Sequence, residues 1–139
     1  MQSTTILSNE TDSIKFAHSF ARTLKAGDIV LFYGDLGSGK TFLCREIIRC
    51  FCGKNTHIIS PTFNLLQTYQ APDFTIYHFD LYRLKSAEEV YELGIEEALQ
   101  NNLCLIEWPQ AIEDMLPARC IKVQLEITDE KGRECSITG

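Results

Sequence analysis

The stretch from Gly34 to Thr41, Gly-Asp-Leu-Gly-Ser-Gly-Lys-Thr, constrains the fold of this chain more than any other feature. It matches the G-x-x-x-x-G-K-[ST] phosphate loop, whose backbone N–H groups face phosphate oxygens at the start of a helix. Residues 28–33 are a short apolar run typical of a buried parallel strand, and residues 41–51 carry apolar side chains at helical spacing. Because both flanks fit, the stretch indicates a nucleotide phosphate site rather than a chance match in a turn.

The motif predicts a role for several residues of the phosphate loop. Gly37 and Gly39 let the backbone bend and approach an oxygen, because no Cβ stands in the way. Lys40 is expected to reach the β- and γ-phosphates of ATP, and the Thr41 hydroxyl to ligate Mg²⁺. Thr11 has a helix cap as its default explanation, with a contact to the adenine edge as the alternative. The residues expected to contact the nucleotide are Thr11, Gly37, Ser38, Gly39, Lys40, Thr41 and Phe42.

The remaining elements predict an α/β fold in one domain spanning residues 1–139: a three-layer, P-loop NTPase-like fold with a mainly parallel central sheet and antiparallel hairpin additions. A helix capped by Asn9 precedes the first strand, and a capping box at Ser86 opens a helix that Gly94 interrupts. The other expected elements are a helix over 10–24, a strand at 57–59, a hairpin of 65–70 with 74–81, a strand at 103–107, a short helix at 111–116 and a closing hairpin of 120–127 with 133–137.

Two acids end apolar strands. Residues 103–107 are four apolar residues followed by Glu107, the form of a Walker B strand whose carboxylate emerges beside the phosphate loop. Glu107 is expected to hold Mg²⁺ through a water or to polarise the attacking water. Asp80 ends the strand 74–81 in the same way, so two carboxylates should converge on one Mg·ATP, with Asp80 as a catalytic group or a partner of Arg83.

Other side chains leave alternatives open. Thr62, in a Ser-Pro-Thr turn, either meets the γ-phosphate or its Mg²⁺, or hydrogen-bonds to the backbone of its own turn. Arg83 is better explained by an ion pair with a nearby acid than by phosphate binding. Trp108 is either an exposed partner anchor or part of the core. His78 receives no role, because a histidine in a strand is more often packed than catalytic.

Composition excludes several classes. Thirteen Lys and Arg against nineteen Asp and Glu give a net charge of −6 without a basic cluster, so direct binding of DNA or another nucleic acid is not expected. No apolar run reaches the ~18 residues of a membrane span, and the N-terminus lacks a secretory pattern. Six cysteines include no C-x-x-C pair, which favours free buried thiols and a cytoplasmic location over a disulfide or zinc framework.

Motifs that other phosphate-loop proteins carry, and that this sequence lacks, narrow the possible classes. A GTPase needs an N-K-x-D guanine reader, and the sequence has none. A small-metabolite kinase usually carries an arginine-rich lid, whereas the six arginines here are scattered. That kinase remains the alternative to an ATPase that acts on a partner, and a nucleotide-dependent binding module is a third possibility.

Four motifs together resemble one family. They are Gly-Asp-Leu-Gly-Ser-Gly-Lys-Thr at 34–41, Ser-Pro-Thr-Phe at 60–63, His-Phe-Asp-Leu-Tyr-Arg at 78–83 and Leu-Ile-Glu-Trp-Pro at 105–109. In this order and spacing they closely resemble the bacterial TsaE (YjeE) family, and the resemblance covers nearly the whole chain. The phosphate loop alone is not specific to that family, but the other three motifs at these spacings are.

The resemblance implies an ATPase of tRNA threonylcarbamoyladenosine biosynthesis that acts on the TsaB–TsaD transferase complex and meets tRNA only indirectly. Carried over by position, residues 37–41 hold the phosphates, and Thr41 and Glu107 serve Mg²⁺. Thr62, Asp80 and Trp108 fall at motif positions tied to ATP turnover, and Thr11 at a position near the base. The resemblance thus makes Asp80, Glu107 and Thr62 the expected catalytic residues.

This sequence departs from the family pattern at two positions. Ser38 replaces the usual alanine, which should be harmless in a loop that works through its backbone. Gln110 replaces the glutamate that commonly follows Trp-Pro, which removes one acid near the site.

Overall fold

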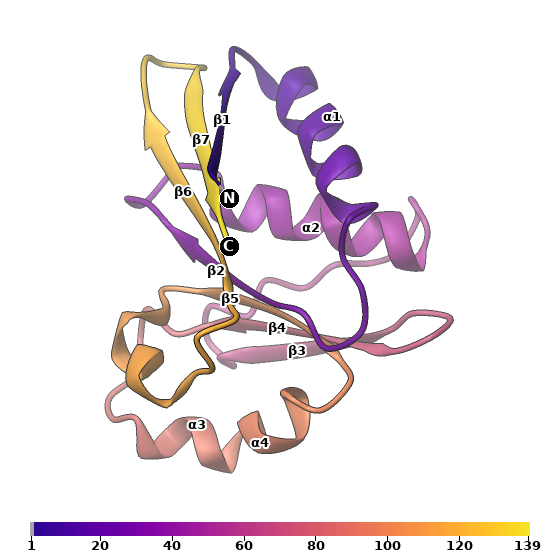
Figure 1. Cartoon of the computed structure of the whole chain (residues 1–139), viewed down its shortest axis with the longest axis vertical. Helices are drawn as coiled ribbons and strands as arrows, with labels where there is room; N and C mark the ends of the chain where they lie inside the picture. Colours follow the sequence, from indigo (N-terminus) through magenta and orange to yellow (C-terminus); the bar gives the residue numbers. More distant parts are fainter. Residues whose placement is uncertain (1) are drawn as a thin grey trace.

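The computed structural model describes residues 2–139 and shows one seven-stranded mixed sheet between two layers of helices (Figure 1). The strand order is β1-β7-β6-β2-β5-β4-β3. The strands are β1 (Gln2–Leu7), β2 (Ile29–Tyr33), β3 (Leu66–Gln70), β4 (Thr75–Asp80), β5 (Leu103–Glu107), β6 (Ile121–Ile127) and β7 (Arg133–Thr138). The helices are α1 (Glu10–Ala21), α2 (Lys40–Cys52), α3 (Glu88–Glu92), α4 (Ile95–Ala98) and the 3-10 helix η1 (Pro109–Met115).

The centre of the sheet is parallel and its edges are antiparallel. Strands β6, β2, β5 and β4 pair in parallel, β3 is added to β4 as a hairpin, and β7 and β1 extend the other edge in antiparallel fashion. β2 and β5 lie at the centre and are almost wholly buried, which matches their near-continuous apolar sequences. The predicted fold class, with its mainly parallel sheet and added hairpins, is confirmed.

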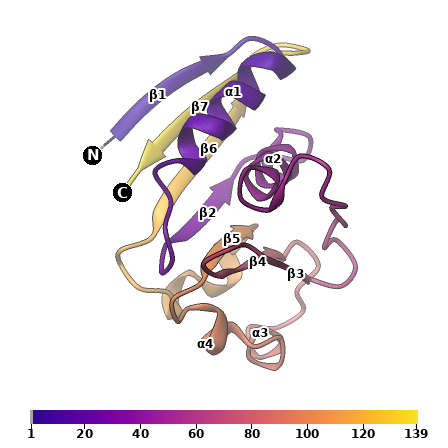
Figure 2. The same cartoon turned by 90° about the vertical axis from the view of Figure 1, so that its right-hand side faces the viewer.

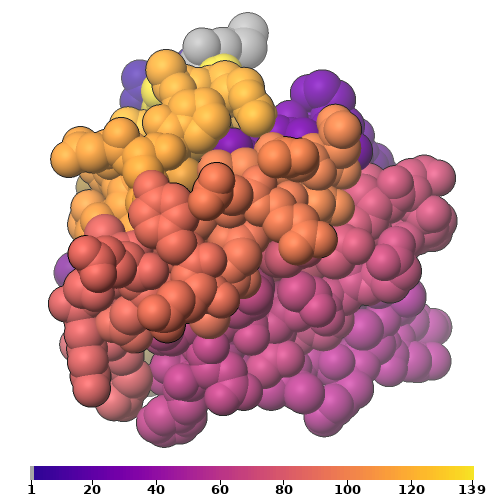
Figure 3. All heavy atoms as spheres, turned by 90° about the horizontal axis from the view of Figure 1, so that it is seen from below, coloured from indigo at the N-terminus to yellow at the C-terminus, as the bar shows by residue number. Residues whose placement is uncertain are grey.

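Helices cover both faces of the sheet. α1 and α2 pack on one face through Ala17, Phe20 and Ile47, whereas α3, α4 and η1 pack on the other through residues such as Val90 and Ile112 (Figure 2). In the view from below, the segment that contains α3 and α4 forms a continuous band across the surface (Figure 3). The α1–α2 side holds the larger apolar core, and the phosphate loop begins where β2 leaves the sheet on the way to α2.

The predicted strand at residues 57–59 is wrong. This segment has no regular structure, and its neighbour in space is a side chain rather than a strand. The Tyr69 hydroxyl lies 3.0 Å from the backbone nitrogen of Ile59 and 3.3 Å from its carbonyl oxygen. These hydrogen bonds satisfy the backbone groups that a ladder would otherwise use, so two isoleucines in sequence do not by themselves make a strand.

The sequence analysis missed β1. Five of its six residues are exposed, and the run Gln-Ser-Thr-Thr lacks the apolar alternation that reveals a half-buried strand. β1 exists because β7 offers it an unpaired edge, along which Gln2 to Leu7 pair with Thr138 to Arg133. It is therefore a product of tertiary pairing rather than of local pattern.

Smaller differences concern the ends of helices. The helix expected at 111–116 is the 3-10 helix η1, which starts earlier because Trp108 adopts φ 55° and Pro109 occupies the first helical position. Half of the capping box at α3 forms: the Glu89 carboxylate accepts from the backbone nitrogens of Lys85 and Ser86, but no side chain caps the helix. Asn9 caps α1 as predicted, accepting from the backbone nitrogen of Asp12 at 2.9 Å.

The structure of residues 2–139 also bears on the expectations about membrane spans and cysteines. None of the helices found there is long and apolar enough to cross a membrane. The six cysteines are all free, and four of them, Cys44, Cys104, Cys120 and Cys135, are buried as expected. The other two, both on α2, differ from the expectation, because Cys50 is exposed and Cys52 is only half-buried.

Candidate functional site

The phosphate loop joins β2 to α2 at the centre of the parallel sheet. Gly37 and Gly39 have φ values of 81° and 103°, in the left-handed region where side chains with a Cβ are strained. Gly39 occupies the cap position of α2, and its carbonyl accepts from the backbone nitrogen of Leu43 to start the helix. The loop therefore has the backbone conformation that its glycines predict, and it stands at the N-terminus of a thirteen-residue helix.

Lys40 is buried beneath the loop and is held by it. Its ammonium donates hydrogen bonds to the carbonyl oxygens of Gly34 and Asp35, and it lies 4.1 Å from the centre of the Trp108 ring. Burial lowers the pKa of Lys40, while the negative charges of Glu107, Asp80 and Asp35 oppose that shift. Trp108 also packs against Tyr82, with ring centres 4.8 Å apart, and it is half-buried, so it is neither a fully exposed anchor nor part of the buried core.

The carboxyl ends of β4 and β5 bring the two predicted acids together. Asp80 and Glu107 are direct partners in the parallel register, so their strands end side by side. Glu107 is buried, and its Oε1 accepts a hydrogen bond of 2.6 Å from the Thr41 hydroxyl at the start of α2. The geometry thus joins the Walker B acid predicted on β5 to the loop threonine predicted to share its metal.

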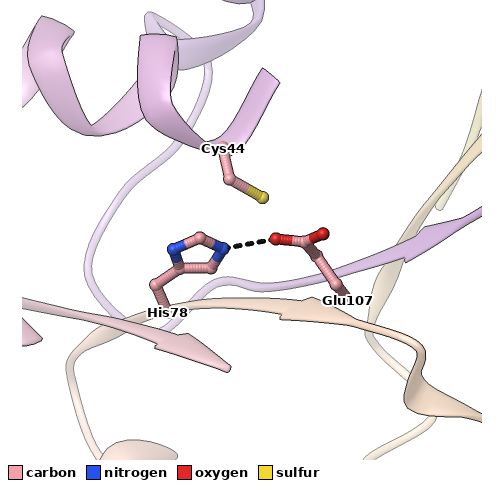
Figure 4. A group of neighbouring side chains, drawn as sticks. All are labelled: Cys44, His78 and Glu107. Carbon is pink, nitrogen blue, oxygen red and sulfur yellow. Dashed lines mark hydrogen bonds and ion pairs between the residues drawn. The ribbon is translucent and has the colours of Figure 1, made fainter. Parts of the chain in front are cut away.

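His78 is the site residue that sequence reasoning missed. Its Nε2 lies 2.6 Å from Oε2 of Glu107, and the ring is fully buried (Figure 4). The signal for it was present, because strand alternation places His78 two residues before Asp80 on the same face of β4. A histidine on the acid-bearing face of that strand has to lie near whatever the acid serves.

Asp80 is buried as well, but it has fewer partners. Its Oδ1 accepts from the backbone nitrogen of Tyr82 at 3.1 Å. Burial raises the pKa of Asp80, and the charge of Glu107 adds to the increase, while the Tyr82 hydrogen bond and nearby positive groups oppose it. An acid that is partly desolvated beside a phosphate loop is suited to positioning a water or accepting its proton.

The ion pair expected for Arg83 is wrong. Among the ion pairs of residues 2–139, none includes Arg83, and its guanidinium instead lies 4.9 Å from the centre of the exposed Phe63 ring. The contact keeps Arg83 at the surface next to residues of the Ser-Pro-Thr-Phe segment, while Asp80 points inward. The structural alternative considered for Asp80, a surface pair with Arg83, therefore does not form.

The Thr62 hydroxyl forms its hydrogen bond within its own turn rather than with the site. Its hydroxyl lies 2.8 Å from the Ser60 hydroxyl within the same turn. Within residues 2–139, no hydrogen bond joins Thr62 to the loop or to the two acids. The local contact in the turn is therefore made with a side chain rather than with the backbone. A catalytic role for Thr62 stays a prediction.

A cavity of about 600 Å³ opens on the other side of the loop. It is lined by four of the residues expected to contact the nucleotide, Thr11, Ser38, Gly39 and Phe42, together with Arg133. Arg133, at the start of β7, donates from Nε to the Ser38 carbonyl at 3.1 Å and from Nη2 to the Gly37 carbonyl at 3.0 Å. No sequence pattern indicated this contact, because 95 residues separate Arg133 from Ser38.

Thr41 in the first turn of α2 and Glu107 at the end of β5 fit Mg²⁺. A threonine hydroxyl and a carboxylate are hard oxygen donors, and Mg²⁺ commonly takes one or two such ligands together with phosphates and water. Thr41 and Glu107 offer them already in contact at 2.6 Å. Cys44, which Figure 4 draws beside His78 and Glu107, is a different kind of donor, and burial raises the pKa of its thiol well above the usual value.

These features define the class. A phosphate loop after a central parallel strand, with a buried acid on the neighbouring strand in contact with the loop threonine, is the arrangement of a P-loop NTPase-like domain.

Comparison with known proteins gives the family. Residues 7–135 match the family described as threonylcarbamoyl adenosine biosynthesis protein TsaE. A protein of Rickettsia bellii named tRNA threonylcarbamoyladenosine biosynthesis protein TsaE is 62% identical over 99% of this chain and 96% of its own length. A protein of the same name from Bacillus subtilis is 32% identical over 96% of this chain and 82% of its own length.

A solved structure agrees with this assignment. The crystal structure of Bacillus subtilis YdiB superimposes with a TM-score of 0.83 at 26% identity and covers all of this chain and 86% of that one. The chain belongs to the TsaE family, which functions in tRNA threonylcarbamoyladenosine biosynthesis.

Proposed function

We propose that this protein is an ATPase of the tRNA threonylcarbamoyladenosine pathway, which hydrolyses Mg·ATP in the cytoplasm in association with the TsaB–TsaD transferase complex. The observation that carries the proposal is the contact between Thr41 and Glu107. It joins the first turn of α2 to the end of β5, beside the phosphate loop and directly opposite Asp80. A loop that merely bound an anion would not need two buried acids at its edge.

Different residues of the chain would bind the phosphates, the Mg²⁺ ion and the nucleoside. Backbone N–H groups of residues 37–41 and the N-terminus of α2 would hold the phosphates, with Lys40 exchanging its carbonyl partners for phosphate oxygens. Thr41 and Glu107 would hold Mg²⁺, which supplies charge neutralisation at the phosphates. Thr11 and Phe42 would face the nucleoside in the cavity beside the loop.

Asp80 would orient the attacking water or accept its proton. Its buried carboxyl has one hydrogen bond from the backbone of Tyr82, which leaves acceptor capacity for a water. Placement of such a group typically contributes a factor of about 10²–10⁴ to the rate. Catalysis would then come mainly from positioning and charge, as in other phosphoryl transfers.

The partner is proposed to be protein rather than RNA. A net charge of −6 disfavours direct contact with the tRNA backbone, so tRNA would be reached through the transferase complex. In titrations at physiological salt, the isolated protein should bind tRNA weakly or not at all. A submicromolar complex that resists salt would make the protein itself an RNA reader and would contradict this part of the proposal.

The central test is ATP hydrolysis by the purified protein with and without the TsaB–TsaD complex. Inorganic phosphate should be released, and the rate should rise when the complex is added. At saturating Mg²⁺, Glu107→Ala should spare nucleotide binding more than hydrolysis, because the loop and Lys40 still hold the phosphates, and it should lose the stimulated turnover. Phosphate that appears on a metabolite instead of in solution would identify a kinase, and nucleotide binding without stimulated hydrolysis would identify a binding module.

A further inference from the structure

The side chain of Glu107 is held from two sides. Oε1 accepts from the Thr41 hydroxyl and Oε2 faces Nε2 of His78, each at 2.6 Å. Both Glu107 and His78 are almost completely buried, with exposed fractions of 1% and 0%. A carboxylate removed from water needs hydrogen-bond donors, and here each oxygen has its own.

The hydrogen-bond pattern assigns the imidazole proton. Nδ1 of His78 is buried and has no hydrogen-bond partner among the described residues. A proton on Nδ1 would bury an unpaired N–H and turn the Nε2 lone pair toward the carboxylate. A proton on Nε2 avoids both costs, so the ring donates Nε2–H to Glu107.

A metal ion does not explain the cluster better. Ligand atoms of Cys44, His78 and Glu107 lie within 4.8 Å of one another, close enough to suggest a metal centre. Tetrahedral Zn²⁺ with bonds of ~2.0–2.2 Å, however, keeps its nitrogen and oxygen ligands about 3.4 Å apart. The 2.6 Å contact between His78 and Glu107 is therefore a hydrogen bond, and Cys44 packs against the pair (Figure 4).

We propose that His78 is a positioning residue for Glu107: its Nε2–H fixes Oε2, which keeps Oε1 turned toward Thr41 and the Mg²⁺ site. The inference rests on the proposed function, since it assigns Glu107 the role of a metal-holding acid. His78 itself touches neither nucleotide nor metal. Groups that orient a metal-binding carboxylate in this way typically contribute a factor of ~10–100 in metal affinity or activity.

The test compares two amides that differ by one methylene. In His78→Gln the side-chain nitrogen lies at the same number of bonds from Cα as Nε2, so it can still donate to Glu107. In His78→Asn the amide is too short to do so. His78→Leu removes the donor with an apolar side chain in case Asn is poorly tolerated, and Ile76→Val, on the same face of β4, is the control for packing.

The first measurement is binding of a fluorescent ATP analogue as a function of Mg²⁺ concentration, with EDTA as the metal-free reference. His78→Asn and His78→Leu should require about 10–100-fold more Mg²⁺ for tight binding, with unchanged affinity in EDTA. Turnover with the partner complex should fall, whereas His78→Gln and Ile76→Val should stay close to the unmodified protein. The same Mg²⁺ requirement in all variants, or equal losses in Gln and Asn, would overturn the inference.

A second measurement does not depend on nucleotide or metal. Thermal unfolding of His78→Leu, Glu107→Leu and the double variant forms a double-mutant cycle. His78→Leu should lower the melting temperature by leaving a buried carboxylate with a missing donor, and it should cost much less when Glu107 is already Leu. Additive losses would show that the two side chains are not coupled. Coupling here without any Mg·ATP binding would refute the proposed function instead.

Discussion

On one side of the phosphate loop, the ends of β4 and β5 enclose His78, Asp80 and Glu107 among buried side chains, whereas on the other side α1 and the start of β7 leave an open cavity of about 600 Å³. We call these the acid side and the cavity side. On the acid side the contacts are between side chains and their distances are short, 2.6 Å from Glu107 to Thr41 and to His78.

The cavity side is built from backbone contacts instead. Arg133 reaches the loop through the carbonyl oxygens of Gly37 and Ser38, and the half-buried guanidinium stays near water. The difference follows from the chemistry that each side would serve. Mg²⁺ and an attacking water need fixed ligands in a site shielded from bulk solvent, whereas a nucleoside needs a larger pocket with side chains to pack against.

Lys40 stands between the two sides, and its removal should have the largest effect. Lys40→Ala deletes the positive charge that would reach the β- and γ-phosphates, so tight ATP binding should be lost. Isothermal titration calorimetry with ATP and Mg²⁺ measures this directly. Nucleotide affinity equal to that of the unmodified protein would mean that the loop does not bind phosphates.

Asp80→Asn tests whether the acid side is catalytic. Losing a group that orients water should reduce partner-stimulated turnover about 10²-fold or more while ATP affinity is nearly intact. Normal hydrolysis by a variant that unfolds easily would instead make Asp80 a structural residue. Turnover and ATP affinity, measured on the same preparation, separate these outcomes.

Asp80→Asn should also change the pH dependence of stability. Burial raises the pKa of Asp80 above its usual 3.8, so the folded protein binds this proton more tightly than the unfolded chain does. The ionised side chain therefore disfavours the folded state above the raised pKa, and this penalty disappears below pH 3.8. Without Mg²⁺ or nucleotide, Asn should have the higher melting temperature at neutral pH and lose that advantage in acid. A constant difference across this range would mean that Asp80 is well solvated.

Arg133→Lys tests the cavity side and should have a smaller effect. Lysine keeps the charge but cannot donate to two carbonyls from a planar fork, so the loop should be less ordered before ATP binds. We expect ATP affinity to fall about tenfold, equivalent to ~1.4 kcal/mol, without a change in Mg²⁺ requirement. A shift in Mg²⁺ requirement as large as that expected for His78→Asn would show that the two sides are not separate.

Cysteine reactivity should show the contrast without any substitution. Cys44 lies buried against the acid side, where loss of solvent and the charge of Glu107 raise its pKa, whereas Cys50 is exposed on the same helix. Iodoacetamide at pH 8 should modify Cys50 in the native protein and leave Cys44 unmodified, as peptide mass spectrometry can show. Fast modification of Cys44 would mean that the acid side opens to water.

Local pattern was enough wherever the chain itself sets the geometry. The glycines of the loop, the apolar run before Glu107 and the alternation around Asp80 each act within a few residues, and the structure has the strands and the loop that they predict. The expected approach of the two acids is also seen, because the strands that they end are parallel neighbours with Asp80 opposite Glu107. Because strand and loop geometry is set by residues close together in the sequence, these features can be predicted from the sequence alone.

The sequence by itself determined the fold class, the phosphate loop and the two acids, because glycine freedom and strand periodicity are local properties. Only the tertiary structure decided that His78 holds Glu107, that Arg133 grips the loop from 95 residues away, and that β1 pairs with β7. Each of these depends on which buried polar group or free edge lacks a partner once the chain has packed. Such a need arises only on packing, because a polar group that loses water, or a strand edge left unpaired, must then be satisfied by whatever the tertiary structure brings nearest.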